Sequence, residues 1–224
     1  MKKTLIGLLT ITMAALLLVG CSNKTASSDK SLNVGILQIV PHGSLDAARK
    51  GFKEQLNKEI KQNHKSIKVN YNYQNAQGDQ SNLNSMAQQL TQKKSDLILG
   101  IATPSAQALA KKTKTTPIVV TAVTNLESAG LVKNDKKPGT NVTGTKDLGP
   151  VDKQVKLLTT MTKNDKPIGV LYNSSEENSV LQIKMVKKYA KNHNLKLNIV
   201  SVTSTNDVAS ALSGLAGKVS GIYI

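Results

Sequence analysis

Hydrophobic and polar positions along this chain alternate between short apolar runs and longer amphipathic segments. The first apolar run is Asn33 to Val40, and after it apolar residues recur three or four positions apart. A short apolar run is typical of a buried strand, and the longer spacing is typical of a helix. The same order continues to Ile224, and we expect strands at 33–40, 67–73, 96–101, 117–120, 167–172, 195–202 and 218–224.

Amphipathic segments separate these runs and predict the helices. The first has its apolar face at Leu45, Ala48, Phe52, Leu56 and Ile60. Further helices are expected around 83–90, from Thr103-Pro104 onward, and at 151–161, 176–192 and 207–215. Strands that alternate with helices are joined by right-handed crossovers and form parallel sheets with helices on both faces. The chain is therefore expected to have an α/β fold.

A stretch rich in Gly, Pro and Asn, from Asn134 to Pro150, interrupts this alternation and predicts a boundary between two lobes. We expect an N-terminal α/β lobe at 32–145, a hinge at 146–150 and a second α/β lobe at 151–224.

The first residues have the pattern of a lipoprotein signal. Lys2 and Lys3 precede an apolar run from Leu5 to Gly20, and the run ends at Cys21, the only cysteine of the chain. We expect a signal peptide at 1–20, a diacylated Cys21 with a polar tether at 21–31, and a location on the outer face of the bacterial cytoplasmic membrane. The alternative is a membrane-spanning anchor, because the apolar run is near the lower length limit for one.

Composition excludes several classes of function. The net charge of +16 is typical of nucleic-acid binding, but Arg49 is the only arginine and aromatic residues make up 3% of the chain. We therefore expect no nucleic-acid partner and assign the lysines to solubility and to attraction toward an anionic cell envelope. The chain contains no catalytic motif, no metal-ligand cluster and no cofactor-binding motif, so we expect a protein that is not an enzyme.

Polar loops follow the predicted strands at the position where ligands bind in open parallel sheets. They are rich in hydroxyl groups and poor in cations. The candidate ligand-binding residues are Gln38, His42, Gly43, Ser44, Thr103, Pro104, Ser105, Thr121, Val123, Thr124, Asn173, Ser174, Glu176, Glu177, Asn178 and Ser179.

These loops predict a site for a small zwitterion. Free backbone N–H groups at helix starts, together with hydroxyls, can hold a carboxylate, and Glu176, Glu177 or Asn178 can accept an ammonium group. The competing interpretation is helix capping, with Thr103 as a cap before Pro104 and a capping box formed by Ser174 and Glu177. His42 either faces a ligand or orders its loop, and Asp46 is interpreted as stabilising the first turn of its helix.

The chain resembles the substrate-binding lipoproteins of ABC importers of the tryptophan/tyrosine type. The resemblance runs from Asn33 to the last residue and is carried by VGILQIVPHGSLDAARKGFKEQL, DLILGIATPSAQALA, TPIVVTAVTNLESAGLV, NVTGTKD and IGVLYNSSEENSVLQI. It implies a type I periplasmic-binding-protein fold, capture of an aromatic amino acid or a related small molecule between two lobes, and delivery to a permease and its ATPase. It also implies that the ligand is lined by Gln38, 42–44, 103–105, 121–124 and 173–179.

The resemblance further implies related chains that continue for roughly a hundred residues beyond Ile224. We therefore expect a second lobe that is incomplete and binding that is weakened or lost. We expect a monomer whose only contact with the membrane is the lipid anchor. The alternative function is that of a lipid-anchored protein that contacts host or cell-wall polymers through its lysines.

Overall fold

The protein is described from a computed structural model, which covers residues 30–64, 66–162 and 165–224. The expected signal peptide and Cys21 lie outside these residues. Within them, no helix has the length and apolarity needed to cross a bilayer.

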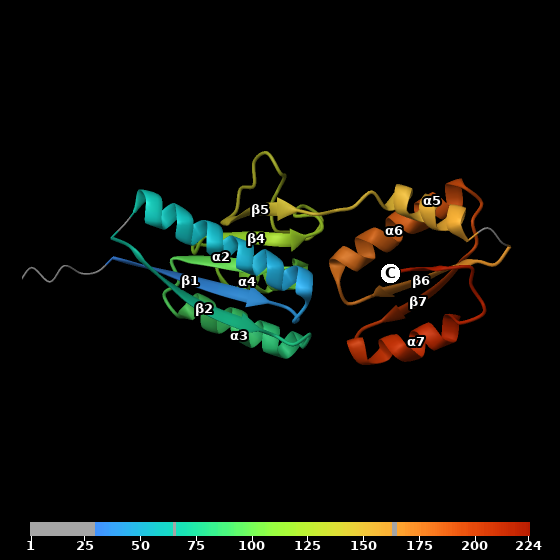
Figure 1. The fold of residues 1–224 in the computed structure, drawn as a ribbon, viewed down its shortest axis with the longest axis horizontal. Coiled ribbons are helices and arrows are strands. Elements are labelled where there is room, and N and C mark those ends of the chain that lie inside the picture. Colours follow the sequence, from blue (N-terminus) through green and yellow to red (C-terminus); the bar gives the residue numbers. More distant parts are fainter. Residues whose placement is uncertain (1–29, 65, 163–164) are drawn as a thin grey trace, which may run out of the picture. The chain divides into compact units, whose positions relative to one another are not determined.

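A five-stranded parallel sheet forms the first lobe (Figure 1). Its strand order is β2-β1-β3-β4-β5. Three helices, α2, α3 and α4, cover it. The strands are β1 (Ser31–Gln38), β2 (Lys68–Asn75), β3 (Leu97–Ile101), β4 (Ile118–Val123) and β5 (Val142–Lys146), and the helices are α2 (Gly43–Asn63), α3 (Gln80–Gln92) and α4 (Thr103–Lys112).

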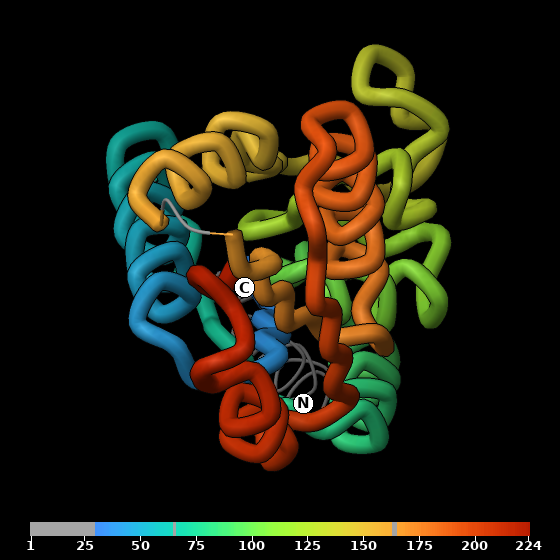
Figure 2. Tube along the Cα trace, turned by 90° about the vertical axis from the view of Figure 1, so that its right-hand side faces the viewer, coloured from blue at the N-terminus to red at the C-terminus, as the bar shows by residue number. Residues whose placement is uncertain are grey.

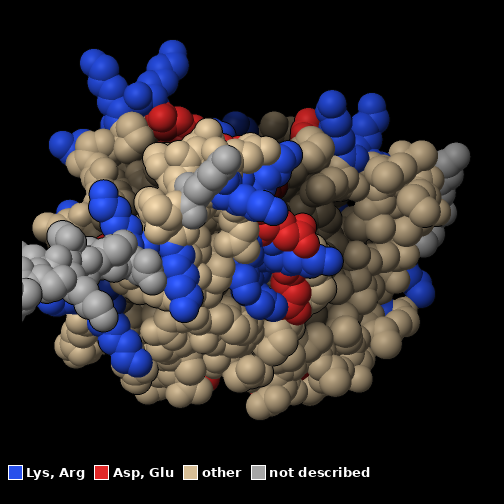
Figure 3. Space-filling model, turned by 60° about the vertical axis from the view of Figure 1, so that its left-hand side comes forward, with Lys and Arg blue, Asp and Glu red and all other residues tan. Residues whose placement is uncertain are grey.

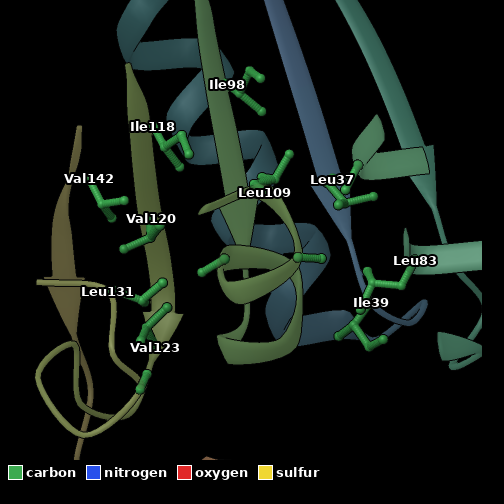
Figure 4. Close-up of a cluster of buried hydrophobic side chains, with 14 of the residues drawn as sticks. Leu37, Ile39, Leu83, Ile98, Leu109, Ile118, Val120, Val123, Leu131 and Val142 are labelled. Atoms are coloured by element: carbon green, nitrogen blue, oxygen red, sulfur yellow. The ribbon is translucent and has the colours of Figure 1, made fainter. Parts of the chain in front are cut away.

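The core of the first lobe has two layers because alternate residues of each strand point to opposite faces of the sheet. On one face, Ile36 and Leu99 pack against Phe52 and Leu56 of α2. The other face packs against α3 and α4, with residues such as Leu83 and Leu109 (Figure 4). Leu45, Phe52 and Leu56 of the apolar face expected for the first helix therefore pack on the sheet, where they are partly buried.

A three-stranded parallel sheet with the order β7-β6-β8 forms the second lobe. One face is covered by α5 and α6, whose Val155 and Ile183 pack against Val170. Helix α7 lies on the opposite face (Figure 1 and Figure 2). The elements are α5 (Val151–Met161), β6 (Ile168–Asn173), α6 (Glu177–Asn192), β7 (Leu197–Val202), a short 3-10 helix η2 (Thr205–Asp207), α7 (Val208–Leu215) and β8 (Ile222–Tyr223).

Strand β5 was not expected from the sequence, which predicted a loop-like boundary from Asn134 to Pro150. Only Val142 of this strand is buried, and the four residues after it are exposed. Strand β5 is thus an edge strand of polar and small residues. It has no apolar run from which a strand could be predicted. The last predicted strand, 218–224, is also shorter in the structure, where only Ile222 and Tyr223 pair with β6.

Candidate functional site

The carboxyl ends of β1, β3 and β4 are neighbours in the first sheet. Gln38, the last residue of β1, pairs with Ile101, and Ile101 pairs with Thr121 of β4. The loops after these strands therefore meet at one edge. This edge brings together the first-lobe candidates Gln38, 42–44, 103–105, 121 and 124.

The start of α4 has an unusual backbone. Ala102 has φ 73° and ψ 157°, a region that is occupied almost only by glycine because a Cβ atom is strained there. Its backbone N–H donates to the carbonyl oxygen of Thr121 at 3.0 Å, which ties the start of α4 to β4. The chain thus turns sharply from β3 into the helix.

Thr103 and Ser105 carry buried hydroxyl groups at this helix start. Thr103 is the first residue of α4, and the residue before the helix, Ala102, makes no side-chain capping bond. The interpretation of Thr103 as a helix cap is therefore wrong. Thr103 is 2% exposed and Ser105 is fully buried, yet neither side-chain oxygen has a hydrogen-bond partner among the described residues.

Unpartnered buried hydroxyls beside a helix N-terminus form a site suited to an anion. The first N–H groups of a helix have no partner within the helix, and the helix dipole places partial positive charge at this end. A carboxylate can accept hydrogen bonds from the hydroxyls and from these N–H groups without any cation.

Gln38 is held in a small polar cluster at the same edge. Its side chain is fully buried, and its Nε2 donates to Val40 O at 2.9 Å and to Asp46 Oδ1 at 3.1 Å. Arg49 also donates to Asp46 Oδ1, at 3.0 Å, and its guanidinium lies 4.1 Å from the ring centre of Tyr73. These contacts orient Gln38 and leave its Oε1 buried without a partner.

Asp46 does more in this cluster than stabilise the first helical turn. The hydrogen bond from Gln38 and then that from Arg49 lower the pKa of its carboxyl group below the ordinary value. Sequence reasoning missed Arg49 and Tyr73 as parts of the edge. Arg49 lies one helical turn after Asp46 and contacts it, and Tyr73 on the neighbouring strand β2 lies against Arg49.

The remaining first-lobe candidates differ in their surroundings. His42 is exposed, and its Nδ1 accepts the backbone N–H of Ser44 at 3.3 Å, so it caps α2 and orders the loop. Gly43 and Ser44 are exposed beside it. Val123 belongs to the hydrophobic core (Figure 4), and Pro104 is buried next to Thr103.

In the second lobe, Asn173 organises the turn between β6 and α6. Its Oδ1 accepts the backbone N–H and the hydroxyl of Ser175 at 3.0 and 2.7 Å, and its Nδ2 donates to Glu176 Oε1 at 3.0 Å. Ser174 instead donates its hydroxyl to Val202 O at 3.4 Å. The expected capping box of Ser174 and Glu177 is wrong, because Glu176 precedes the helix and no side chain caps it.

Helix α6 contributes further acceptors at this edge. Asn178 has a buried Oδ1 without a partner among the described residues. Glu176 and Glu177 are half-buried beside it. This part of the lobe presents oxygen acceptors, whereas the start of α4 presents donors.

A cavity of about 250 Å³ opens at the carboxyl ends of β6 and β7. Most of its lining is apolar, with Tyr172, Ile183 and Tyr223 among the larger side chains, and Asn173 and Ser179 lie on its wall. Sequence reasoning missed Ser204 and Thr205, which also line the cavity and follow β7. A hydroxyl-rich loop after a predicted strand was the available signal, because the same signal identified the other loops.

Comparison with known proteins gives consistent matches along this chain. The Tyrosine-binding protein of Clostridioides difficile (strain R20291) is 40% identical over 233 residues, which cover 100% of this chain and 67% of that protein. The crystal structure of an ABC domain in complex with L-Trp from Streptococcus pneumonia is 41% identical with a TM-score of 0.78, over 86% of this chain and 64% of that one. A conserved domain protein from Vibrio cholerae O1 biovar eltor is 39% identical with a TM-score of 0.80, over 87% of this chain and 65% of that one.

The chain thus spans about two-thirds of the length of the relatives that it matches. Its parallel sheets flanked by helices match the type I periplasmic-binding-protein fold of the solved structures, as the resemblance implied. Residues 33–224 match the family described as ABC transporter substrate binding protein, which covers both lobes of the structure. The chain therefore belongs to the ABC transporter substrate binding protein family.

Proposed function

We propose that this protein captures a small zwitterion, an aromatic amino acid, and that the start of α4 binds its carboxylate. The observation that carries this proposal is the pair of buried, unpartnered hydroxyls of Thr103 and Ser105. A buried hydroxyl without a partner costs about 1–3 kcal/mol. A ligand carboxylate that accepts hydrogen bonds from both groups offsets this cost in the bound state.

The second lobe supplies acceptors for the ammonium group. Asn178 Oδ1 has no partner in the part of the chain that the structure describes, and Glu176 and Glu177 add negative charge next to it. A ligand that contacts both lobes favours the closed state over the open state, and the difference in contacts drives the closure.

Relatives support the aromatic class of the ligand. A 40% identical protein is described as tyrosine-binding, and a 41% identical structure contains L-Trp. The chain has no tryptophan and one phenylalanine, so an aromatic sandwich of the kind that binds sugars or quaternary amines is disfavoured.

Anchoring and delivery complete the proposal. Cys21 carries the acyl chains that hold the protein on the outer face of the cytoplasmic membrane, and the loaded protein passes its ligand to an ABC permease and ATPase. Acyl anchoring is favourable by about 0.8 kcal/mol for each buried CH₂ group, so a diacylated cysteine retains a water-soluble domain.

A thermal-shift screen against the twenty amino acids tests the ligand. The screen uses this chain and a fusion that adds the carboxyl-terminal third of the tyrosine-binding relative, because the chain spans 67% of that protein. Tyrosine or tryptophan at about one hundred times its dissociation constant is expected to add about 2.7 kcal/mol of stability. If the fusion binds tyrosine or tryptophan and this chain does not, the shorter length of the chain explains the loss. If neither binds, the proposed ligand class is wrong.

Variants of α4 test the carboxylate site. Ser105→Ala and Thr103→Val are each expected to weaken binding about tenfold or more, because each removes one hydrogen bond to a charged group. Ser128→Ala is the control, since its hydroxyl is exposed and donates only to Asn125 O, at 3.4 Å. If tyrosinamide and tryptophanamide, which lack the carboxylate, bind as well as the free amino acids, the assignment is wrong.

A further inference from the structure

Lysine side chains gather at the amino-terminal edge of the first sheet, where the chain enters β1. Ser31 begins β1 and pairs with Lys68 at the start of β2. Because the strands are parallel, the segments that lead into β3 and β4 reach the same edge, as does the end of α2. These segments carry eight exposed lysines, here called the basal lysines: Lys30, Lys61, Lys68, Lys93, Lys94, Lys111, Lys112 and Lys114.

Nearby carboxylates offset only part of the positive charge of this surface. Glu59 and Asp96 are the acidic residues closest in sequence, and both accept hydrogen bonds from amide groups. None of the three ion pairs formed by the described residues includes a basal lysine. Figure 3 brings this end of the first lobe forward and shows blue Lys and Arg side chains on a mostly tan surface, with red side chains on the same face.

The opposite edge of the same sheet has a different charge. Its loops and strand ends contain charges of both signs together with the hydroxyl groups of the candidate site: Asp79, Glu127, Asp135 and Asp147 beside Lys133, Lys136, Lys137 and Lys146. Acidic and basic residues are therefore mixed at this edge, whereas lysines outnumber carboxylates at the amino-terminal edge.

The attachment of the chain brings the basal lysines close to the membrane. Cys21 precedes Ser31 by ten residues. A segment of ten residues spans at most about 36 Å when fully extended, and electrostatic attraction extends about 8 Å at physiological ionic strength. The edge at which the tether joins the folded chain is thus the edge that can reach the headgroups first.

We propose that the basal lysines dock the first lobe on the anionic headgroups of the membrane to which Cys21 is anchored. This proposal rests on the lipid anchor proposed above and goes beyond it, because the lobe itself contacts the bilayer. Clustered lysines bind anionic leaflets through the phosphate charge of the lipids. Docking through this edge directs the candidate site of the first lobe away from the bilayer.

Labelling of lysines on vesicles tests the docking surface. The acylated full chain is inserted into the outer leaflet of vesicles made of phosphatidylcholine alone or mixed with phosphatidylglycerol. A membrane-impermeant amine reagent then labels the lysines, and peptide mass spectrometry measures the rate at each one. Lys93, Lys94, Lys111 and Lys112 are expected to react at least about fivefold more slowly on the anionic vesicles, and high salt should restore their rate.

The exposed lysines of α6 provide an internal control. Lys184, Lys187, Lys188 and Lys191 should react at the same rate on both kinds of vesicle. In a variant with Lys93, Lys94, Lys111 and Lys112 changed to Gln, the protection of Lys61 and Lys68 should disappear. The matched variant, in which the four α6 lysines are changed to Gln, should keep that protection.

Two outcomes would overturn the proposal. One is equal labelling of the basal lysines on zwitterionic and anionic vesicles. The other is protection by a soluble phosphate polymer on zwitterionic vesicles without protection on phosphatidylglycerol, which would assign the surface to a polymer. The intact mass of the chain reports acylation of Cys21 separately, so the anchor and the docking surface can fail independently.

Discussion

At the scale of single residues, the start of α4 combines three features that each disfavour the folded state. Ala102 has a strained backbone, and Thr103 and Ser105 bury hydroxyls without partners. Strain of this kind costs about 1–3 kcal/mol and persists where the surrounding structure imposes it, often at binding sites. The same segment that we assign to the carboxylate is thus a local weak point of the unliganded protein.

Ser105→Ala separates stability from binding. Its hydroxyl makes no hydrogen bond to any residue that the structure describes, so its removal should leave the free energy of unfolding unchanged or raise it by up to about 1 kcal/mol. Urea denaturation without ligand measures this change. A loss of more than about 1 kcal/mol would show that the hydroxyl has a partner in the folded protein.

Ala102→Gly should relieve the backbone strain. Glycine tolerates φ 73°, so the free energy of unfolding should rise by about 1 kcal/mol after the entropy cost of glycine is subtracted. Ala47→Gly is the matched control on the exposed face of α2, where the same substitution should destabilise by about 1 kcal/mol. If urea denaturation shows that both substitutions change the free energy of unfolding in the same direction, the backbone of Ala102 is not strained.

Asp46→Asn should change how stability depends on acid. The pKa of Asp46 is lowered in the folded chain, so its ionised form stabilises the fold above about pH 4, and this contribution is lost as the pH falls through the folded pKa. The melting temperature of the unmodified protein should therefore drop more steeply between about pH 5 and pH 3 than that of the variant. Parallel acid profiles would indicate that Asp46 has the same pKa in both states.

At the scale of secondary-structure elements, apolar periodicity predicted most of the fold, because most elements bury one face. The helix expected at 151–161 has those bounds in α5, and Leu45, Phe52 and Leu56 do pack on the sheet. Strand β5 was not predicted because only Val142 of this strand is buried, so it has no apolar periodicity. The hydrogen-bond partner of a polar side chain also depends on residues that are distant in sequence. For this reason the helix-capping roles predicted for Thr103 and Ser174 were wrong.

Gly144 shows why β5 needs a residue without a side chain. A Cβ atom there would lie 2.0 Å from the carbonyl oxygen of Val120 on the neighbouring strand. Gly144→Ala should therefore displace β5 and lower the free energy of unfolding by about 2–3 kcal/mol.

Gly51→Ala is the matched control for this substitution. Gly51 lies in α2, and an added Cβ atom would meet nothing within 4 Å. The change should stabilise the protein by up to about 1 kcal/mol because alanine has the higher helix propensity. If both variants show the same midpoint of urea denaturation as the original chain, the close contact at Gly144 is absent in solution.

At the scale of the whole molecule, the parallel topology accounts for the placement of both candidate surfaces. Polar loops after strands could be assigned to the carboxyl edges from the sequence alone. The concentration of lysines at the amino-terminal edge was not visible there, because Lys30, Lys68 and Lys111 are distant in sequence and scattered lysines are usual on solvated faces. Only the strand order brings them to one surface.

The edge strands of the second lobe are less buried than the central strands of the first. Five consecutive residues end β1 in the buried core, whereas only Val202 is buried in β7 and neither residue of β8 is. Segments with fewer buried contacts open at a lower free energy than the core. Amide hydrogens of β7 and β8 should therefore exchange faster than those of β1 and β3, as hydrogen-exchange mass spectrometry can measure.

A ligand held by both lobes should reduce this difference in exchange. Contacts from Asn178 and from the start of α4 to one zwitterion would couple opening of the second lobe to loss of the ligand. Tyrosine or tryptophan should then slow exchange in the turn at Asn173 and at the start of α6 as well as at the start of α4. If the ligand protects only the first lobe, it binds there alone, and the proposed closure of two lobes over a shared ligand would have to be abandoned.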